Sequence, residues 1–275
     1  MTGISIAQAL TAAQTLGLDR LDAQWLLLHA LGKTDADRSW LLAHDADPLE
    51  AMVAAAFRSL SLRRANGEPL AYIVGYKEFF GLRLTVDARV LIPRPDTETL
   101  VQWALDVGHG LTEPKVLDLG TGSGAVAVAL AHHLKTHVTA SDFSLDALAV
   151  ASQNAKQLGA DVAFIHSNWL DKVSGHYHVI VSNPPYIEVG DPHLAALTHE
   201  PLDALTAGSD GLDDIRQIIQ QAPRHLHPGG WLLLEHGYNQ AAAVCELLGK
   251  QGFKDVQSKM DLAGIARCSG GKWPP

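Results

Sequence analysis

Four consecutive residues, Asn183, Pro184, Pro185 and Tyr186, carry the clearest chemical pattern, and they follow an apolar run that ends at Ser182. Two successive prolines fix φ and remove two backbone donors, so the chain leaves the preceding strand stiffly and presents carbonyl oxygens. The Asn183 side chain adds an amide oxygen as a further acceptor. Two converging acceptors, Asn183 Oδ1 and the Pro184 carbonyl, suit an –NH2 group, which has two donors. The pattern therefore predicts a site that holds a planar amide-type nitrogen.

Such a nitrogen is a weak nucleophile because its lone pair is conjugated. Holding both N–H groups directs the lone pair towards an electrophile, and this positioning can supply much of the lowering of a reaction barrier. The same acceptors stabilise the positive charge that grows on the nitrogen. We therefore expect Asn183, Pro184, Pro185 and Tyr186 to be catalytic, with the Tyr186 ring stacked on the flat substrate group. A general base is not required, since the product nitrogen can lose its proton to water.

The electrophile is indicated by a glycine-rich segment, residues 118–124, that follows an apolar strand and precedes a helix. Glycines let the backbone turn sharply and approach a ligand closely. The glycine spacing also fits the dinucleotide-binding fingerprint, but Asp118 favours S-adenosylmethionine, whose ammonium needs an anionic acceptor. Asp142, at the end of the next strand, suits the ribose hydroxyls of either cofactor. The cofactor-binding residues predicted in this part of the chain are Asp118, Gly120, Thr121, Gly122, Ser123, Gly124 and Asp142.

The elements that must position these residues change in character along the chain. Residues 1–65 have helical apolar spacing, and Asp47 with Pro48 is expected to open the last of their helices. Residues 80–86 alternate as a strand does, with Gly81 at a turn or bulge. From residue 115 strands alternate with helices, which predicts an α/β fold with a mostly parallel, doubly wound sheet. We predict a helical domain at 1–70, a β-hairpin linker at 71–92 and a catalytic domain at 93–275.

Composition excludes several classes of function. The formal net charge is −9 and no long Lys/Arg run occurs, which argues against a protein that grips nucleic acid phosphates. Cys245 and Cys268 are too few for a disulfide scaffold, and the histidine pairs lack the spacing of metal ligands. No apolar run reaches the roughly 18 residues of a membrane helix. We expect a cytoplasmic monomer with no metal, no membrane partner and no direct nucleic acid partner.

Taken together, these motifs resemble the HemK/PrmC family, the peptide chain release factor glutamine methyltransferases. Residues 67–75 and 78–81 are similar to the family's linker, 90–98 (Val-Leu-Ile-Pro-Arg-Pro-Asp-Thr-Glu) to its second signature, 118–124 and 183–186 to its cofactor and substrate motifs, and 235–237 and 261–264 to its C-terminal marks. The resemblance implies a Rossmann-like domain of the class I S-adenosylmethionine-dependent methyltransferases, preceded by a small helical bundle that recognises the release factor. It also places cofactor contacts at Trp169 and Asn183, and the amide of Asn168, next to Trp169, is expected to meet the adenine edge of the cofactor.

The activity implied by the resemblance is methyl transfer to the side-chain amide nitrogen of the glutamine in a Gly-Gly-Gln motif, with S-adenosylhomocysteine as product. Within the family, a ribosomal-protein glutamine methyltransferase is the nearest alternative, but that branch typically has Pro-Arg-Ser-Pro where this chain has Pro-Arg-Pro-Asp at 93–96. An amino-methylating nucleic acid enzyme would have to bind phosphates, which the acidic balance disfavours. A non-catalytic cofactor-binding protein would have no use for residues 183–186. The chain departs from the commonest family residues at Asn168 and at Thr198-His199.

Overall fold

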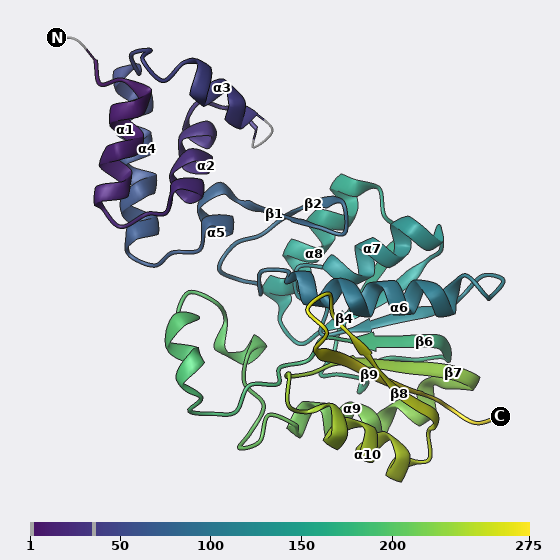
Figure 1. Cartoon of the computed structure of the whole chain (residues 1–275). Coiled ribbons are helices and arrows are strands. Elements are labelled where there is room, and N and C mark those ends of the chain that lie inside the picture. Colours follow the sequence, from purple (N-terminus) through teal and green to yellow (C-terminus); the bar gives the residue numbers. More distant parts are fainter. Residues whose placement is uncertain (1–2, 35–36) are drawn as a thin grey trace. The chain divides into compact units, whose positions relative to one another are not determined.

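The first of the two units into which the chain divides, Met1–Gly75, is built from helices. The structure is a computed structural model and describes residues 3–34 and 37–275, so residues 1, 2, 35 and 36 of the predicted domain 1–70 lie outside the described residues. Helix α2 packs against α1 and α4, and its Leu26, Leu27 and Leu28 are buried. The helices described are α1 (Ile6–Thr15), α2 (Arg20–Ala30), α3 (Arg38–Ala43), α4 (Ala51–Ala65) and α5 (Leu70–Val74) (Figure 1).

Helix starts in this unit follow local capping rules at two places and depart from them at a third. Ser5 forms a capping box with Gln8 at the start of α1, and Asp19 accepts a backbone N–H at the start of α2. The predicted helix start at Asp47 is wrong, because α4 begins at Ala51. The Asp47 carbonyl instead accepts the Ile6 N–H at 3.1 Å. A backbone hydrogen bond to a distant segment therefore overrides the local signal at residues 47–48.

The second unit, Tyr76–Pro275, opens with an antiparallel hairpin of β1 (Tyr76–Phe79) and β2 (Leu82–Thr85). Its two turn residues, Phe80 and Gly81, have φ of 49° and 73°. Positive φ at both central residues is the requirement of the hairpin turn whose twist matches the strands, so the predicted turn at Gly81 is confirmed. The division between the units falls after Gly75. The predicted boundaries at residues 70 and 92 stay predictions.

A seven-stranded sheet, in the order β5-β4-β3-β6-β7-β9-β8, forms the centre of the second unit. The five strands from β5 to β7 are parallel, whereas β9 runs antiparallel to β7 and β8 antiparallel to β9. The predicted α/β fold with a mostly parallel sheet is therefore confirmed. The strands are β3 (Val116–Leu119), β4 (Val138–Asp142), β5 (Val162–His166), β6 (Tyr177–Ser182), β7 (Leu226–Glu235), β8 (Lys254–Met260) and β9 (Ala266–Lys272).

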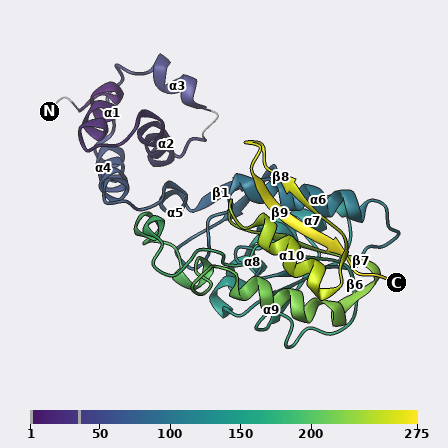
Figure 2. The same cartoon turned by 60° about the horizontal axis from the view of Figure 1, so that its bottom comes forward.

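Helices cover both faces of this sheet and bury a separate core on each (Figures 1 and 2). Along β6, Val179 and Val181 face one core and Ile180 the other, as the two-residue period of a strand requires. The first core lies under α6 (Glu98–Gly108), α7 (Ala125–Leu134) and α8 (Leu145–Leu158), and the second under α9 (Asp213–Gln221) and α10 (Ala241–Gln251). Helix α9 is an addition to the predicted elements, and its buried isoleucines, Ile215, Ile218 and Ile219, have helical spacing.

The order of the strands brings two distant segments together. The chain runs outwards from β3 through β4 to β5 and then returns to place β6 on the other side of β3. In the parallel register Leu119 lies opposite Ser182, so both strands end at the same edge. A crevice forms where strand order reverses in this way, and ligands of open α/β sheets bind there. Residues 120–124 and residues 183–186 both leave the sheet at this point.

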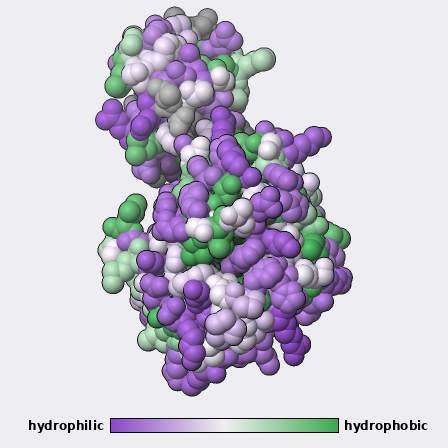
Figure 3. Space-filling model, turned by 90° about the vertical axis from the view of Figure 1, so that its right-hand side faces the viewer, coloured by the Kyte–Doolittle hydropathy of each residue, from purple (hydrophilic) through white to green (hydrophobic). Residues whose placement is uncertain are grey.

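The outer surface is mostly hydrophilic on the face drawn in Figure 3, where hydrophobic residues form small, separate patches. In the part of the chain that the structure describes, no helix combines the length and apolar character needed to cross a bilayer.

One acidic side chain lies inside the sheet rather than at its surface. Asp118, in β3, is 1% exposed, and its Oδ2 accepts hydrogen bonds from the Thr121 hydroxyl at 2.7 Å and from the Ala127 N–H at 3.2 Å. Burial raises the pKa of the Asp118 carboxyl to about 7, and these two hydrogen bonds oppose the rise only in part. The folded protein therefore keeps a proton on this group at pH values where an exposed aspartate has lost it.

Replacing Asp118 by Asn should remove a pH dependence of stability. Between the ordinary pKa of 3.8 and the folded value of about 7, the folded state binds a proton that the unfolded state has released, so this group's stabilising contribution falls as the pH rises through that window. The melting temperature of Asp118→Asn, relative to the unmodified protein, should therefore be higher at about pH 8 than at about pH 5. Thermal melts at both pH values measure this, with exposed Asp106→Asn as the matched control. A difference that does not change with pH would contradict it.

Candidate active site

The glycine-rich loop leaves β3 and turns directly into α7. Gly120, Gly122 and Gly124 have φ of 67°, 54° and 81°, a left-handed conformation that residues with a Cβ rarely adopt. A Cβ on Gly124 would also lie 3.0 Å from the Cβ of Ala151. The loop is tied to the next strand by the Thr121 N–H, which donates to the Ser141 carbonyl at 2.9 Å. These glycines therefore allow a tight turn whose backbone faces the crevice.

Two aspartates fix this loop from opposite sides. Asp118 holds it from within the core through Thr121 and does not line the pocket. Asp142 ends β4 and lines the pocket; its Oδ2 accepts the Gly122 N–H at 2.9 Å and its Oδ1 accepts the Ser144 N–H at 2.9 Å. Burial raises the pKa of the Asp142 carboxyl, and those backbone hydrogen bonds lower it. Asp142 thus presents a fixed carboxylate to the pocket, whereas a direct contact of Asp118 with a cofactor ammonium stays a prediction.

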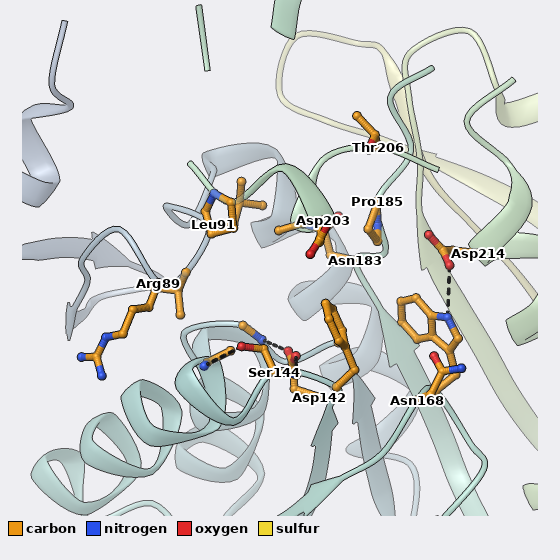
Figure 4. Close-up of a pocket in the computed structure, with 18 of the residues that line it drawn as sticks. Arg89, Leu91, Asp142, Ser144, Asn168, Asn183, Pro185, Asp203, Thr206 and Asp214 are labelled. Atoms are coloured by element: carbon orange, nitrogen blue, oxygen red, sulfur yellow. Dashed lines mark hydrogen bonds between the residues drawn. The ribbon is translucent and has the colours of Figure 1, made fainter. Parts of the chain in front are cut away.

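A pocket of about 480 Å³ lies over the ends of β3, β4 and β6 (Figure 4). Of the predicted cofactor and catalytic residues, those that line it are Gly120, Gly122, Asp142, Asn168, Trp169, Asn183 and Pro185. The others, which lie in the same segments but outside the lining, are Asp118, Thr121, Ser123, Gly124, Pro184 and Tyr186. The pocket's volume falls within the range of small-molecule sites in proteins, roughly 300–1,000 Å³.

Several lining residues come from segments that the sequence analysis does not assign to the site. They lie at residues 89–91, where the second signature begins, around the start of α8, directly after β5, in the segment that follows residue 186, and at the start of α9. The residues concerned are Arg89, Val90, Leu91, Phe143, Ser144, Ala147, Ser167, Pro201, Asp203, Ala204, Thr206 and Asp214. Their positions follow from the folding of long connections over the sheet edge, for which no local motif gives a signal.

Trp169 closes one side of the pocket in a strained backbone conformation. Its φ is 45°, and its indole N–H donates to Asp214 Oδ1 at 3.1 Å (Figure 4). A Cβ on Gly120 would lie 3.1 Å from the Trp169 ring, so the glycine is required for the ring to lie against the loop. Burial raises the pKa of the Asp214 carboxyl, and the bond from Trp169 lowers it. The indole is therefore held in one orientation by both packing and a hydrogen bond.

The tetrapeptide at 183–186 is held by hydrogen bonds on either side. The Ser182 hydroxyl donates to the Leu119 carbonyl at 2.8 Å, which ties the end of β6 to the start of the glycine loop. Asn183 Nδ2 donates to the Thr97 hydroxyl oxygen at 3.2 Å. The amide oxygen of Asn183 is then the end of the side chain that can accept from a substrate, and Asn183 itself lines the pocket.

Tyr186 lies deeper than its predicted stacking role requires. Its hydroxyl donates to Glu235 Oε1 at 3.3 Å, and its carbonyl accepts from Gln240 Nε2 at 3.0 Å. A Cβ on Gly211, whose φ is 69°, would lie 2.1 Å from that carbonyl oxygen, so only glycine fits there. Burial, and the Glu235 carboxylate next to it, raise the pKa of the Tyr186 hydroxyl. Stacking of Tyr186 on a substrate stays a prediction.

The second signature, residues 90–98, connects the site to four separate segments. Arg94 forms an ion pair with Glu200, and Glu200 Oε2 also accepts the Ile92 N–H at 3.1 Å. Beyond Arg94, the side chains of the signature contact β9, the tetrapeptide and the hairpin. These contacts are the Asp96–Arg267 ion pair at 3.2 Å, the Thr97–Asn183 hydrogen bond, and the hydrogen bond from the Phe80 N–H to Glu98 Oε1 at 3.0 Å. The sequence identifies this segment as a signature, whereas the partners of its side chains follow from the tertiary structure.

Metal chemistry finds no support in the side-chain arrangement. Among residues 3–34 and 37–275, no group of three or more His, Cys, Asp or Glu side chains is placed to hold a metal ion.

Comparison with known proteins connects this geometry to a family. Residues 5–75 match the PrmC N-terminal domain and residues 97–258 the methyltransferase small domain. A release factor glutamine methyltransferase of Bordetella pertussis is 49% identical over 260 residues, covering 93% of this chain and 95% of that protein. One of Burkholderia pseudomallei is 48% identical over 278 residues, covering 96% of each.

A solved structure, the 16S rRNA N2 G1207 methyltransferase of T. thermophilus in complex with AdoMet and guanosine, shares the fold, with a TM-score of 0.55, 19% identity, and coverage of 72% of this chain and 49% of that one. The sequence resemblance and the methyltransferase fold predicted from it are thereby confirmed. From the relatives that match along nearly its whole length, we conclude that the chain belongs to the family of release factor glutamine methyltransferases.

Proposed function

We propose that this protein transfers one methyl group from S-adenosylmethionine to the side-chain amide nitrogen of the glutamine in the Gly-Gly-Gln motif of peptide chain release factors. The observation that carries the proposal is the arrangement at the sheet edge. A glycine loop with a carboxylate, Asp142, and an amide acceptor, Asn183, line one pocket. The family's substrate, taken with this arrangement, supports glutamine as the nucleophile.

The residues of the pocket suit the proposed cofactor by their chemistry. The Asp142 carboxylate keeps acceptor capacity on both oxygens beyond its two backbone hydrogen bonds, as a ribose diol requires. Gly120 and Gly122 leave the loop backbone accessible, and Trp169 with Asn168 adds a flat wall and an amide. When bound, S-adenosylmethionine supplies a methyl group on a positively charged sulfur, which is the electrophile of the reaction.

The chain's own groups act on the nucleophile. Asn183 Oδ1 and the Pro184 carbonyl accept the two N–H bonds of the substrate amide, which directs the nitrogen lone pair away from them. As the nitrogen gains the methyl group it becomes positive, and both acceptors stabilise that charge. The nitrogen then loses one proton to water. Positioning and charge stabilisation, not proton abstraction, are therefore the catalytic contribution of this segment.

The first test identifies the methylated atom. We expect incubation with purified release factor and methyl-labelled S-adenosylmethionine to place the label on the Gly-Gly-Gln peptide, because the glutamine amide has two N–H donors for the two proposed acceptors, Asn183 and Pro184. Tryptic mapping with mass spectrometry measures it, and a release factor with Gln replaced by Glu in that motif is the control. Label on ribosomal protein, RNA or DNA under the same conditions would refute the substrate assignment.

Asn183→Ala should reduce kcat by about 100-fold or more while the Kd of S-adenosylmethionine changes little, because Asn183 acts mainly on the nucleophile. Steady-state kinetics and calorimetric titration separate the two quantities. Gln153→Ala, which removes an exposed amide from α8, is the matched control and should behave as the unmodified protein. Weak cofactor binding with normal turnover would mean that Asn183 belongs to cofactor binding alone.

A variant that begins at Tyr76 should raise the KM for whole release factor, with a smaller effect on a short Gly-Gly-Gln peptide. The reason is that the helical unit Met1–Gly75 is proposed to recognise the release factor, whereas the pocket is built from residues of the second unit alone. Kinetics with both substrates measure this, and the Kd of S-adenosylmethionine serves as the control for folding. Equal KM values for whole release factor with and without the helices would exclude the recognition role.

A further inference from the structure

Two buried residues outside the pocket lining contact the proposed catalytic tetrapeptide, residues 183–186. Thr97, from the second signature, is 4% exposed, and its hydroxyl oxygen accepts a hydrogen bond from Asn183 Nδ2. Glu235, at the end of β7, is 0% exposed, and its Oε1 accepts a hydrogen bond from the Tyr186 hydroxyl. Both ends of the tetrapeptide are thus connected to residues that lie outside the pocket lining.

Thr97 and Glu235 also interact with each other. Burial raises the pKa of the Glu235 carboxyl to about 7, and the neighbouring Thr97 and Tyr186 hydroxyls lower it. Glu235 Oε2 has no hydrogen-bond partner within the described stretches 3–34 and 37–275. A buried carboxyl oxygen without a hydrogen-bond partner lowers the stability of the folded protein, which points to a role for Glu235 other than stability. Neither residue belongs to the two apolar cores of the sheet.

We propose that Thr97 and Glu235 are positioning residues that set the orientation of the Asn183 amide. A carboxylate can only accept, so the Thr97 hydroxyl gives its single proton to Glu235. The Thr97 oxygen can then only accept from Asn183, which selects Nδ2 as the end that faces it. Asn183 Oδ1 is thereby directed to the substrate, and this inference rests on the proposed role of Asn183 as an acceptor for the glutamine –NH2 group.

The orientation matters because the two ends of an amide have opposite hydrogen-bonding character. With the amide reversed, Asn183 would present two donors to a substrate group that also has only donors. The nitrogen lone pair would then be misdirected, and displacement of a reacting group by about 1 Å can cost about 100-fold in rate. Among the described residues, Thr97 provides the hydrogen bond that distinguishes the two ends of the Asn183 amide.

The charge state of Glu235 allows the positioning role to be tested separately, through the pH dependence of kcat. The charged and titratable groups that face it are Asp96, Tyr186, Arg267 and Cys268, of which Arg267 lowers the pKa of Glu235 and Asp96 raises it. Ionised Glu235 accepts from Thr97, whereas protonated Glu235 has one O–H donor and can donate to the Thr97 oxygen, which reverses that hydrogen bond. Since the ionised form predominates above a pKa of about 7, turnover should fall as the pH decreases through that value.

The experiment compares Thr97→Val, Thr97→Ser and Glu235→Gln in the full-length protein with purified release factor. We expect kcat to fall by about 10- to 100-fold in Thr97→Val and in Glu235→Gln, with the Kd of S-adenosylmethionine little changed. Thr97→Ser retains the hydroxyl and should recover most of the turnover lost in Thr97→Val. The fall in kcat as the pH decreases should be absent from Glu235→Gln. Thr136→Val, which removes a threonine hydrogen bond to the Pro114 carbonyl away from the pocket, is the matched control.

A double-mutant cycle separates positioning from a general loss of stability. On the Asn183→Ala background, Thr97→Val should have no further effect on kcat, because the orientation of an absent amide has no consequence. Additive effects, or a loss of kcat that accompanies a fall in melting temperature and appears equally in Thr136→Val, would overturn the proposal. If Asn183→Ala is inactive but Thr97→Val turns over normally, the positioning role is overturned and the proposed function of Asn183 stands. Normal turnover in Asn183→Ala would refute the proposed function of Asn183, and the positioning role with it.

Discussion

The parallel pairing of β3 with β6 is the constraint on which the site depends. It places Leu119 opposite Ser182, and the Ser182 hydroxyl donates to the Leu119 carbonyl. Residues that follow these two positions, although about sixty apart in the chain, must therefore leave the sheet side by side. A slip of one residue would turn every side chain of β6 to the opposite face, so that Val179 and Val181 would leave the first core and Ile180 the second. The glycine loop and the tetrapeptide meet because this register is enforced by burial on both faces.

Buried carboxyl groups have three different uses at this edge of the sheet. Asp118 faces inwards and holds the glycine loop through Thr121, Asp142 faces the pocket, and Glu235 contacts Tyr186. Burial raises the pKa of each, which means that the fold tolerates groups that cost stability when ionised. Hydrogen bonds from neighbouring donors limit this cost for all three. The same carboxyl chemistry therefore serves loop geometry, the lining of the pocket and the proposed orientation of a catalytic amide.

The second signature, residues 90–98, contributes Val90 and Leu91 to the pocket lining, and its other residues contact segments farther away. Arg94 and Ile92 connect to Glu200, which follows the tetrapeptide by a long loop, and Asp96 connects to Arg267 of β9. Because these partners lie in different parts of the second unit, the signature ties together segments that the sheet alone does not connect. Thr97 lies in the middle of this set of contacts and reaches Asn183.

Local chemistry determined much of this protein from its sequence alone. The strand and helix periods predicted the mostly parallel sheet, and Gly81 predicted the hairpin turn, because each depends on neighbours in the chain. The glycines at 120–124 and the residues at 183–186 likewise predicted a site. Because each segment follows a strand, the sequence also predicted that the site lies where those strands end. The start of α4 was predicted wrongly, since Asp47 has a distant partner in Ile6.

Tertiary structure decided which side chains of those motifs face the pocket and which face the core. Asp118 and Asp142 are both acids at strand positions near the glycine loop, yet only Asp142 lines the pocket. Thr97 and Glu235 come together across 138 residues of sequence through the pairing of strands and the course of the second signature. The direction of a side chain and the identity of its partner depend on contacts between segments far apart in the chain, and a local pattern carries no record of them.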